Sequence, residues 1–490
     1  MTLLPFLPIL IPMAFALIAL LWPSKSRIIG IIGSATLLIA AVLLLIEING
    51  RGIVAAQVGN WPAPFGITFV IDYLSAVMVM LAGVMALVVS IYAYRGIDPA
   101  RHRFGFFPFF FFLLMGVCGA FTTGDLFNMY VWFEVLLISS FVLLALGGER
   151  PQLEGAVKYV TLNLLSSTFF LIALALIYGK LGTLNIADIA AKAAQMHDDT
   201  LLKIAALLLM AAFGVKAAVF PLYFWLPASY HTPPAAVSAL FAGLMTKVGV
   251  YALIRAFTLI FIHDRGQTHN ILLILASLTM FFGVIGAAVQ FDFRRILAFH
   301  SISQIGYMIM GLALFTPLAL AGAVFFMVHH TLVKSNLFLI SGVVAHLRGT
   351  FDLKKLGGLY QSHPLLAVLF IIAAFSLAGL PPLTGFWAKF FLVKAGLQTE
   401  AYITVLAALV VSLLTLYSMT KIWAEVFWKD DPQPEVPTAP NRLSLTLPVM
   451  LMAALILLFS FAAEPLVQLT LKTAEQLLDP QIYIRAVLGE

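Results

Sequence analysis

The chain has 490 residues, of which 62% are hydrophobic and only 10% are charged, with one cysteine and a formal net charge of +6. A soluble domain ordinarily carries about 25% charged residues, so this composition excludes a soluble enzyme and favours a polytopic α-helical membrane protein. The apolar runs are long and unbroken, whereas a transmembrane β-barrel shows short alternating segments of about ten residues. A lone Cys118 excludes an internal disulfide and a cysteine-ligated iron–sulfur cluster.

Fourteen apolar runs follow one another along the chain, each close to the roughly 20 residues that a helix needs to cross a bilayer. They are 3–22, 28–48, 70–94, 106–123, 126–146, 157–178, 201–221, 236–262, 271–289, 295–314, 318–344, 364–393, 402–428 and 443–463. We therefore predict an all-α polytopic membrane protein with about 14 transmembrane helices. The polar stretches between the runs are only loop-sized, which predicts a single membrane domain over residues 1–490.

Basic residues are unevenly distributed between the connections. The odd-numbered connections are rich in lysine and arginine, with Arg101, Arg103, Arg294 and Arg295 as examples, and the even-numbered ones are poorer. The positive-inside rule then places the odd connections in the cytoplasm and both termini outside. Because lysine and arginine are concentrated between the apolar runs, the net charge does not indicate nucleic acid as a partner.

Two of the runs are interrupted in a related way. The end of the seventh run and the residues that follow it read KAAVFPLYFWLP (216–227), and the twelfth run contains GLPPLTGFWAK (379–389). Proline removes a backbone donor and breaks a helix, and irregular backbone at membrane depth persists only where it is buried or lines a watery cavity. A single proline kink is common in membrane helices. Two breaks with lysines beside them favour a transporter built from repeats, with ion sites at the breaks.

Ionisable side chains near the middle of apolar runs are the main functional candidates. A charge at the bilayer centre costs about 2.5–3.5 kcal/mol even on the insertion scale, so such residues face the protein interior and are functional by default. They are Glu134 in the fifth run, Lys216 in the seventh, Lys247 in the eighth, His300 in the tenth, His329, His330 and Lys334 in the eleventh, and Lys389 just past the second break.

One acid followed by lysines and histidines on different helices is typical of a proton relay. Moving a carboxylate such as Glu134 toward or away from buried Lys216 changes how readily the lysine releases its proton. Histidine titrates near neutral pH and transfers protons through water. The set does not suit a metal or cation cage, because lysines repel a cation that needs oxygen ligands. We therefore expect no metal and no cofactor.

Each candidate also has a structural interpretation. Lys389 can extend its amine to the membrane interface, Lys334 can be a structural partner of His330, and His300 can be a packing residue. His300, Gln304 and Tyr307 fall at i, i+4 and i+7, which places them on one face of one helix. Other charged residues are expected to be less central: Asp72, Glu425 and Glu464 near span ends, solvated or at subunit contacts, and Arg294 and Arg295 as topology anchors.

Five segments carry a family resemblance. They are GDLFNMYVWFEVLLISSFVLL (124–144), GVKAAVFPLYFWLPASYHTPPAAVSALFAGLMTKVGVY (214–251), DFRRILAFHSISQIGYMIMG (292–311), HHTLVKSNLFLISG (329–342) and SLAGLPPLTGFWAKF (376–390). Together they resemble the antiporter-like family shared by proton-pumping respiratory complex I and the Mrp/Mnh multisubunit cation/proton antiporters. The form of the fifth span and the total length favour the Mrp D-subunit branch, because an A subunit would carry a long C-terminal extension.

The resemblance implies two inverted five-helix repeats, 106–262 and 271–428, each with a broken helix. Helices in 1–105 precede them, and a last helix and tail in 443–490 follow. It also implies a hydrated relay in the membrane plane. In that relay Glu134 pairs with Lys216, and Lys247 is the lysine that bridges Lys216 to the next carriers. The histidines of the eleventh span continue the path, and Lys389 is its last residue. The chain departs from the family at His300 and Gln304, where serine and histidine are common, so the role of His300 stays open.

These features predict a proton-translocating subunit of a multisubunit Na⁺ or K⁺/H⁺ antiporter, a secondary transporter and not an enzyme. The expected partners are other antiporter subunits, protons, monovalent cations and the lipid bilayer. One alternative is an antiporter-like, proton-pumping subunit of complex I or of a membrane-bound hydrogenase. Another is a structural membrane scaffold, for which neutralising the buried charges would leave transport unchanged.

Overall fold

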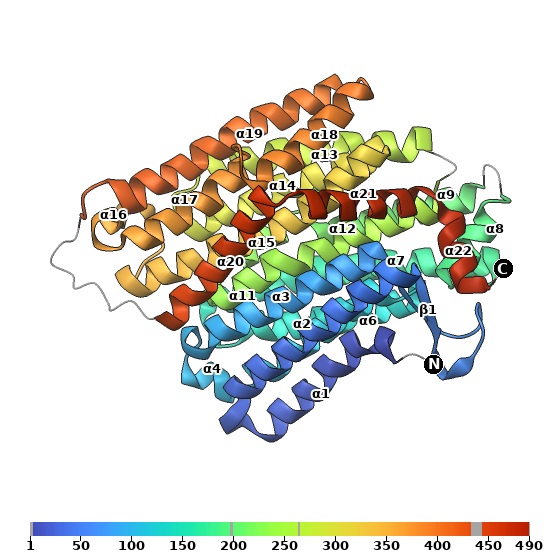
Figure 1. The fold of residues 1–490 in the computed structure, drawn as a ribbon, viewed down its shortest axis with the longest axis horizontal. Helices are drawn as coiled ribbons and strands as arrows, with labels where there is room; N and C mark the ends of the chain where they lie inside the picture. Colours follow the sequence, from blue (N-terminus) through green and yellow to red (C-terminus); the bar gives the residue numbers. More distant parts are fainter. Residues whose placement is uncertain (1–2, 197–198, 263–264, 433–442, 490) are drawn as a thin grey trace.

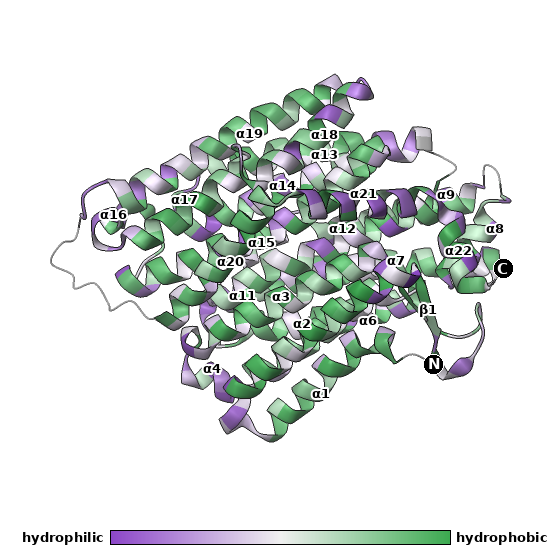
Figure 2. Ribbon diagram, viewed as in Figure 1, coloured by the Kyte–Doolittle hydropathy of each residue, from purple (hydrophilic) through white to green (hydrophobic). Residues whose placement is uncertain are grey.

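The computed structural model describes residues 3–196, 199–262, 265–432 and 443–489. Over these residues the chain is a bundle of long helices running roughly parallel and antiparallel to one another (Figure 1). Twelve described helices are long and apolar enough to cross a membrane, and Phe106–Thr122 and Pro364–Ala378 are shorter apolar helices. Every predicted apolar run overlaps one of these segments, which confirms the all-α polytopic fold. Hydrophobic residues dominate most spans, and polar residues gather at the ends of the bundle and along α21 Glu464–Leu478 (Figure 2).

The elements have the following bounds. The α-helices are α1 Leu7–Leu21, α2 Ser26–Arg51, α3 Tyr73–Gly96, α4 Pro99–Arg103, α5 Phe106–Thr122, α6 Leu126–Ala145, α7 Arg150–Leu181, α8 Ile186–Ala193, α9 Thr200–Ala217, α10 Trp225–Ser229, α11 Ala235–Leu240, α12 Thr246–Arg255, α13 Arg265–Ala288, α14 Phe293–Leu314, α15 Pro317–Arg348, α16 Leu359–Ser362, α17 Pro364–Ala378, α18 Thr384–Gln398, α19 Tyr402–Trp423, α20 Leu443–Phe461, α21 Glu464–Leu478 and α22 Pro480–Leu488. Three π-helical turns, η4 Phe241–Met245, η5 Ala256–Ile260 and η7 Ala424–Trp428, continue α11, α12 and α19. Four short 3₁₀ turns, η1 Leu4–Phe6, η2 Pro23–Lys25, η3 Val58–Asn60 and η6 Leu353–Lys355, complete the helical elements.

Aspartates fix the start of three spans. The carboxylates of Asp72, Asp125 and Asp292 accept hydrogen bonds from the backbone N–H groups three residues later, at the beginnings of α3, α6 and α14. An N-cap of this kind satisfies one of the orphan backbone donors in the first turn of a helix and places negative charge at the positive end of the helix dipole. The three helices therefore begin directly after an aspartate that caps them.

Two helix pairs are closed by equivalent backbone bridges. Asp125, before α6, pairs with Asn185, after α7, and Asp292, before α14, pairs with Asp352, after α15. The first bridge lies at the end of the bundle that carries α8, and the second at the end that carries α16 (Figure 1). The same local design therefore recurs at opposite ends of the bundle.

Several elements at one end of the bundle are absent from the predicted runs. Strands β1 Val54–Gln57 and β2 Thr68–Ile71 form an antiparallel hairpin, with Val54 opposite Ile71, so the third run begins in a strand and its helix starts only at Tyr73. Helices α8 and α22 and both termini lie at this same end (Figure 1). The tail after α20 forms α21 and α22, which are amphipathic and not transmembrane runs.

Candidate functional site

The first break lies directly after Lys216. Helix α9 ends at Ala217, and Ala218 adopts a left-handed conformation with φ of 62°, so the chain leaves the helix and resumes it only at Trp225. The indole N–H of Trp225 donates a 2.8 Å hydrogen bond to the carbonyl of Val215, which satisfies one of the carbonyls at the helix end. Gly249 of α12 packs against the backbone of Lys216 and Ala217, where a Cβ would collide. The break therefore brings α12 close to a buried lysine.

Glu134 and Lys216 do not form the expected direct ion pair. The Glu134 carboxylate on α6 accepts a hydrogen bond from the hydroxyl of Ser167 on α7. The Lys216 ammonium makes no hydrogen bond to any described residue and stands 5.7 Å from the ring centre of Phe133. Glu134 still acts on Lys216 electrostatically. The expected Glu134–Lys216 contact is therefore not formed in this structure, and the Glu134 carboxylate is hydrogen-bonded to Ser167 instead.

The second break holds Lys389 tightly. Helix α17 ends at Ala378, Gly379 turns the chain with φ of 90°, and α18 begins at Thr384. The Lys389 ammonium donates hydrogen bonds to the carbonyls of Leu377 (3.0 Å) and Ala378 (2.8 Å) and to the hydroxyl of Ser412 (2.8 Å). Lys389 therefore points into the break.

A short polar chain connects the second break to α15. His329 Nδ1 and the Thr384 hydroxyl are 2.8 Å apart, and the Thr384 and Ser376 hydroxyls are also 2.8 Å apart. The backbone N–H of Thr384 donates to Ser460 of α20 at 3.0 Å. Gly385 packs against the Ser376 carbonyl and the His329 ring, so this crossing requires glycine. His329 is consequently tied to the same break that holds Lys389.

Lys247 sits beside a π-helical turn. Its ammonium donates to the carbonyl of Ala242, five residues earlier in the η4 turn. Two hydroxyl groups of α15 donate hydrogen bonds to backbone carbonyls of the span that contains Lys247. Thr331 donates to the carbonyl of Gly243 and Ser335 to that of Ala239, both at 3.0 Å. Functional sites frequently contain π-turns, because the extra residue frees backbone groups and redirects side chains. Here the turn places Lys247 in a span that packs directly on α15.

Fully buried polar groups lie between the two breaks. His300, His330, Lys334 and Asn336 are fully buried, and their side-chain nitrogen and oxygen atoms make no hydrogen bond to any other described residue. His330 and Lys334, at i and i+4, are therefore not hydrogen-bonded to each other. Buried polar groups are nearly always satisfied by protein or by ordered water. This cluster is chemically suited to hold water molecules between titratable side chains.

His300, Gln304 and Tyr307 were predicted to share one face of a helix, and of these three only His300 belongs to this cluster. Tyr307 on α14 donates a 2.5 Å hydrogen bond to the carbonyl of Ala408 on α19, and the Lys389 ammonium stands 5.2 Å from the Tyr307 ring centre. Gln304 donates to the neighbouring Ser303 at 3.1 Å. Over the described residues, His, Cys, Asp and Glu form no group of three or more suited to a metal.

Comparisons with known proteins agree with this geometry. Residues 123–415 match the model of the family described as NADH:quinone oxidoreductase/Mrp antiporter, TM. The D subunit of the Na(+)/H(+) antiporter from Alkalihalophilus pseudofirmus is 48% identical over 99% of both chains, and its counterpart from Bacillus subtilis is 40% identical over 99% of both. The chain belongs to the Mrp antiporter D-subunit family. A chain in a structure of the Mrp complex from Dietzia sp. superposes with a TM-score of 0.94, at 33% identity and 100% coverage of both chains.

The D-subunit site also contains residues that the sequence interpretation missed. Ser167 holds the Glu134 carboxylate, and Ser412 and Thr384 complete the surroundings of Lys389 and His329. Tyr159 and Ser140 form a buried 2.6 Å hydroxyl pair beside the first break. Isolated hydroxyls in an apolar run usually bond their own helix backbone, so spacing alone does not separate these residues from ordinary serines and threonines. Only the packing of α7 on α6, and of α19 on the second break, reveals them.

Proposed function

We propose that this D-subunit family member is the proton-translocating subunit of a multisubunit Na⁺/H⁺ antiporter in the cell membrane. Protons pass along the membrane plane through buried side chains and the water between them. The proposed carriers are Glu134, Lys216, Lys247, His300, His329, His330, Lys334 and Lys389. The relatives that carry the name of antiporter D subunits support the transport reaction, and the two lysines at the two breaks support the relay.

The observation that carries the proposal is a group of buried side-chain nitrogen atoms, those of Lys216, His330 and Lys334, that make no hydrogen bond to a described residue. Lys216 marks one end and Lys389 the other, while Lys334 and His330 lie on α15 between them. Each group is able to accept and release a proton, and water is the natural partner for atoms that the protein leaves unbonded. A proton arriving at one lysine therefore has a sequence of acceptors leading to the other.

Glu134 supplies the switch in this mechanism. Its carboxylate lies on a partly exposed face of α6, with exposed Val131 and Ile138 one turn away on either side. When the carboxylate leaves Ser167 and approaches Lys216, it stabilises the charged lysine, and when it returns, the lysine loses that support. A neighbouring subunit packed on this face would set the position of Glu134. The relay is thereby coupled to other subunits of the complex.

The same proposal fixes the orientation. The end that carries α4 and α16 faces the cytoplasm, and the end with the hairpin, α8 and both termini faces outward (Figure 1). The redox-driven alternative, a complex I or hydrogenase subunit, is less favoured, because the relatives matching nearly the whole chain at 48% and 40% identity are antiporter D subunits. Copurification distinguishes the two: small antiporter subunits in one case, and flavin and iron–sulfur proteins in the other.

Antiport in everted membrane vesicles tests the proposal. The variants Glu134→Ala and Lys216→Ala, each in complexes assembled to wild-type levels, are expected to abolish Na⁺-dependent dissipation of the proton gradient. Glu154→Ala and Lys158→Ala are matched controls, because these residues form an exposed ion pair on α7 and are expected to leave antiport unchanged. Wild-type antiport in both relay variants would refute the relay and favour a scaffold.

A further inference from the structure

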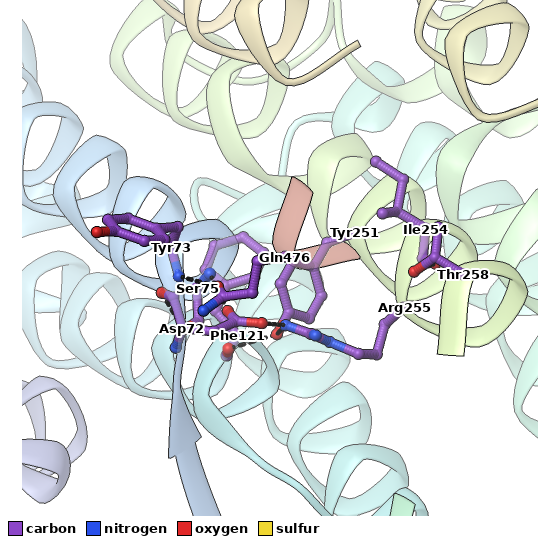
Figure 3. A network of polar contacts seen from close by, with 9 residues as sticks. All are labelled: Asp72, Tyr73, Ser75, Phe121, Tyr251, Ile254, Arg255, Thr258 and Gln476. Atoms are coloured by element: carbon purple, nitrogen blue, oxygen red, sulfur yellow. Dashed lines mark hydrogen bonds and ion pairs between the residues drawn. The ribbon is translucent and has the colours of Figure 1, made fainter. Parts of the chain in front are cut away.

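A buried ion pair lies away from the relay, at the end of the bundle that carries the hairpin. Asp72 Oδ2 and Arg255 Nη2 are 2.6 Å apart, and the two side chains are 2% and 5% exposed. Figure 3 shows the pair facing each other between α3 and the span of α12. The expectation that Asp72 is solvated or at a subunit contact is therefore wrong. Two charges removed from water carry a large desolvation cost, so a specific role is needed to explain them.

Parts of the chain far apart in sequence hold this pair in place. The Asp72 carboxylate caps α3 by accepting the Ser75 N–H at 2.9 Å. The Arg255 guanidinium stands 5.0 Å from the ring centre of Tyr483 in α22. Gln476 of α21 accepts the N–H of Tyr73 at 3.0 Å, next to Asp72 (Figure 3). The C-terminal helices thus close over the ion pair and restrain both partners.

Polar side chains on one face of a single helix run from Lys247 to this pair. Lys247, Tyr251 and Arg255 are spaced at i, i+4 and i+8 on the same helix, which places them along one face over about 12 Å. Tyr251 donates a 2.6 Å hydrogen bond to the Phe121 carbonyl and accepts one from Arg255 at 3.2 Å. These side chains therefore lead from a proposed proton carrier straight toward the outer end of the bundle.

We propose that the Asp72–Arg255 pair is an electrostatic barrier that closes this outward route, so that protons on Lys247 move sideways instead of escaping. This inference rests on the relay proposed above. A guanidinium is always protonated, and a fixed positive charge on a narrow polar route repels protons and other cations. Asp72 offsets the cost of burying that charge and fixes its position. Arg255 is then a specificity-determining residue that acts on the direction of proton movement.

Proton leak through the purified, fully assembled complex tests the barrier. The complex is reconstituted in liposomes containing a pH dye, in choline buffer free of Na⁺ and K⁺, with tetraphenylphosphonium balancing charge. We expect Arg255→Met to collapse an imposed pH gradient severalfold faster than wild type, and Arg255→Lys to stay tight. Arg51→Gln is the matched control, since Arg51 is exposed and pairs with the partly buried Glu47 at the same end of the bundle.

A double variant identifies the route of the leak. If protons escape from the relay, Arg255→Met combined with Lys247→Leu returns the leak to the wild-type rate. A leak that persists in the double variant, or a tight Arg255→Met complex, overturns the barrier. If the Arg255→Met complex does not assemble, two other variants test the barrier. We expect Arg255→Gln to leak and the double variant Asp72→Arg with Arg255→Asp to remain tight. A tight Arg255→Gln complex or a leaking double variant would overturn the barrier.

The relay and the barrier fail in different ways. If Glu134→Ala and Lys216→Ala abolish antiport while the neutral Arg255 variants remain tight, only the barrier is refuted. If those two variants retain antiport, the relay itself is refuted, whatever the leak measurements give.

Discussion

The Lys389 ammonium donates a 2.8 Å hydrogen bond to the carbonyl of Ala378, the last residue of α17. A helix end leaves carbonyls without intrahelical partners and carries partial negative charge, so the break itself creates the binding site for the lysine. Lys216 lies near the matching end of α9, yet its ammonium makes no hydrogen bond to a described residue. The second break thus holds its lysine by hydrogen bonds, whereas the lysine at the first break makes none to a described residue.

Replacing Lys389 by methionine keeps the length of the side chain and removes its charge. We expect antiport in everted vesicles to fall by roughly a hundredfold or to background, because a positioned proton carrier contributes a factor of that order. Lys394→Met is the control, since Lys394 is an exposed lysine on the same helix. Equal antiport rates in the two variants would show that Lys389 does not carry protons.

Ser167→Ala tests how the Glu134 carboxylate is positioned. Without the hydroxyl that bonds it, the carboxylate no longer has a fixed resting position away from Lys216. We expect an antiport rate between those of wild type and Glu134→Ala. Thr168→Ala is the matched control, because this exposed hydroxyl bonds only the Leu164 carbonyl of its own helix. A rate for Ser167→Ala equal to wild type would contradict a role for this contact.

Gly249→Val tests the close packing of α12 on the first break. The added side chain would meet the backbone of Ala217 and Lys216, and overpacking of a tight contact typically costs about 1–3 kcal/mol. We expect a lower melting temperature of the purified complex and loss of antiport. Gly179→Ala in α7 adds its methyl group to open space and should change neither. An unaltered melting curve for Gly249→Val would show that the helices are not in contact here.

His102 gives a pH-dependent prediction outside the spans. Burial and the nearby charge of Arg27 lower the pKa of His102 from 6.5 to about 4, so the folded protein keeps this ring neutral. The unfolded chain binds a proton more readily, and stability is therefore lost as the pH falls from 6.5 toward 4. His102→Phe should flatten the melting temperature across that interval. A decline as steep as that of wild type would contradict the buried, neutral state.

The sequence predicts the spans well, and also the burial of most proposed relay residues. Both depend on the residue types within one apolar run and not on contacts with distant parts of the chain. Apolar runs must be helical in a bilayer, and a lysine in such a run must face the interior. Long-range contacts are different. Nothing near Asp72 in the sequence reveals Arg255, and nothing near Glu134 reveals that Ser167 holds it. The strands between α2 and α3 were not predicted either, because four residues are too few to show a clear alternation of apolar and polar side chains.

Water density in the assembled complex tests the central claim most directly. A cryo-EM map fine enough to show ordered water should contain waters bonded to Lys216, His300, His330 and Lys334, joined into a path toward Lys389. The side-chain nitrogens of the first four residues have no bonding partner among the described residues, so water is their expected ligand. Dry apolar packing around these groups, with no water between the two breaks, would contradict proton movement along this row.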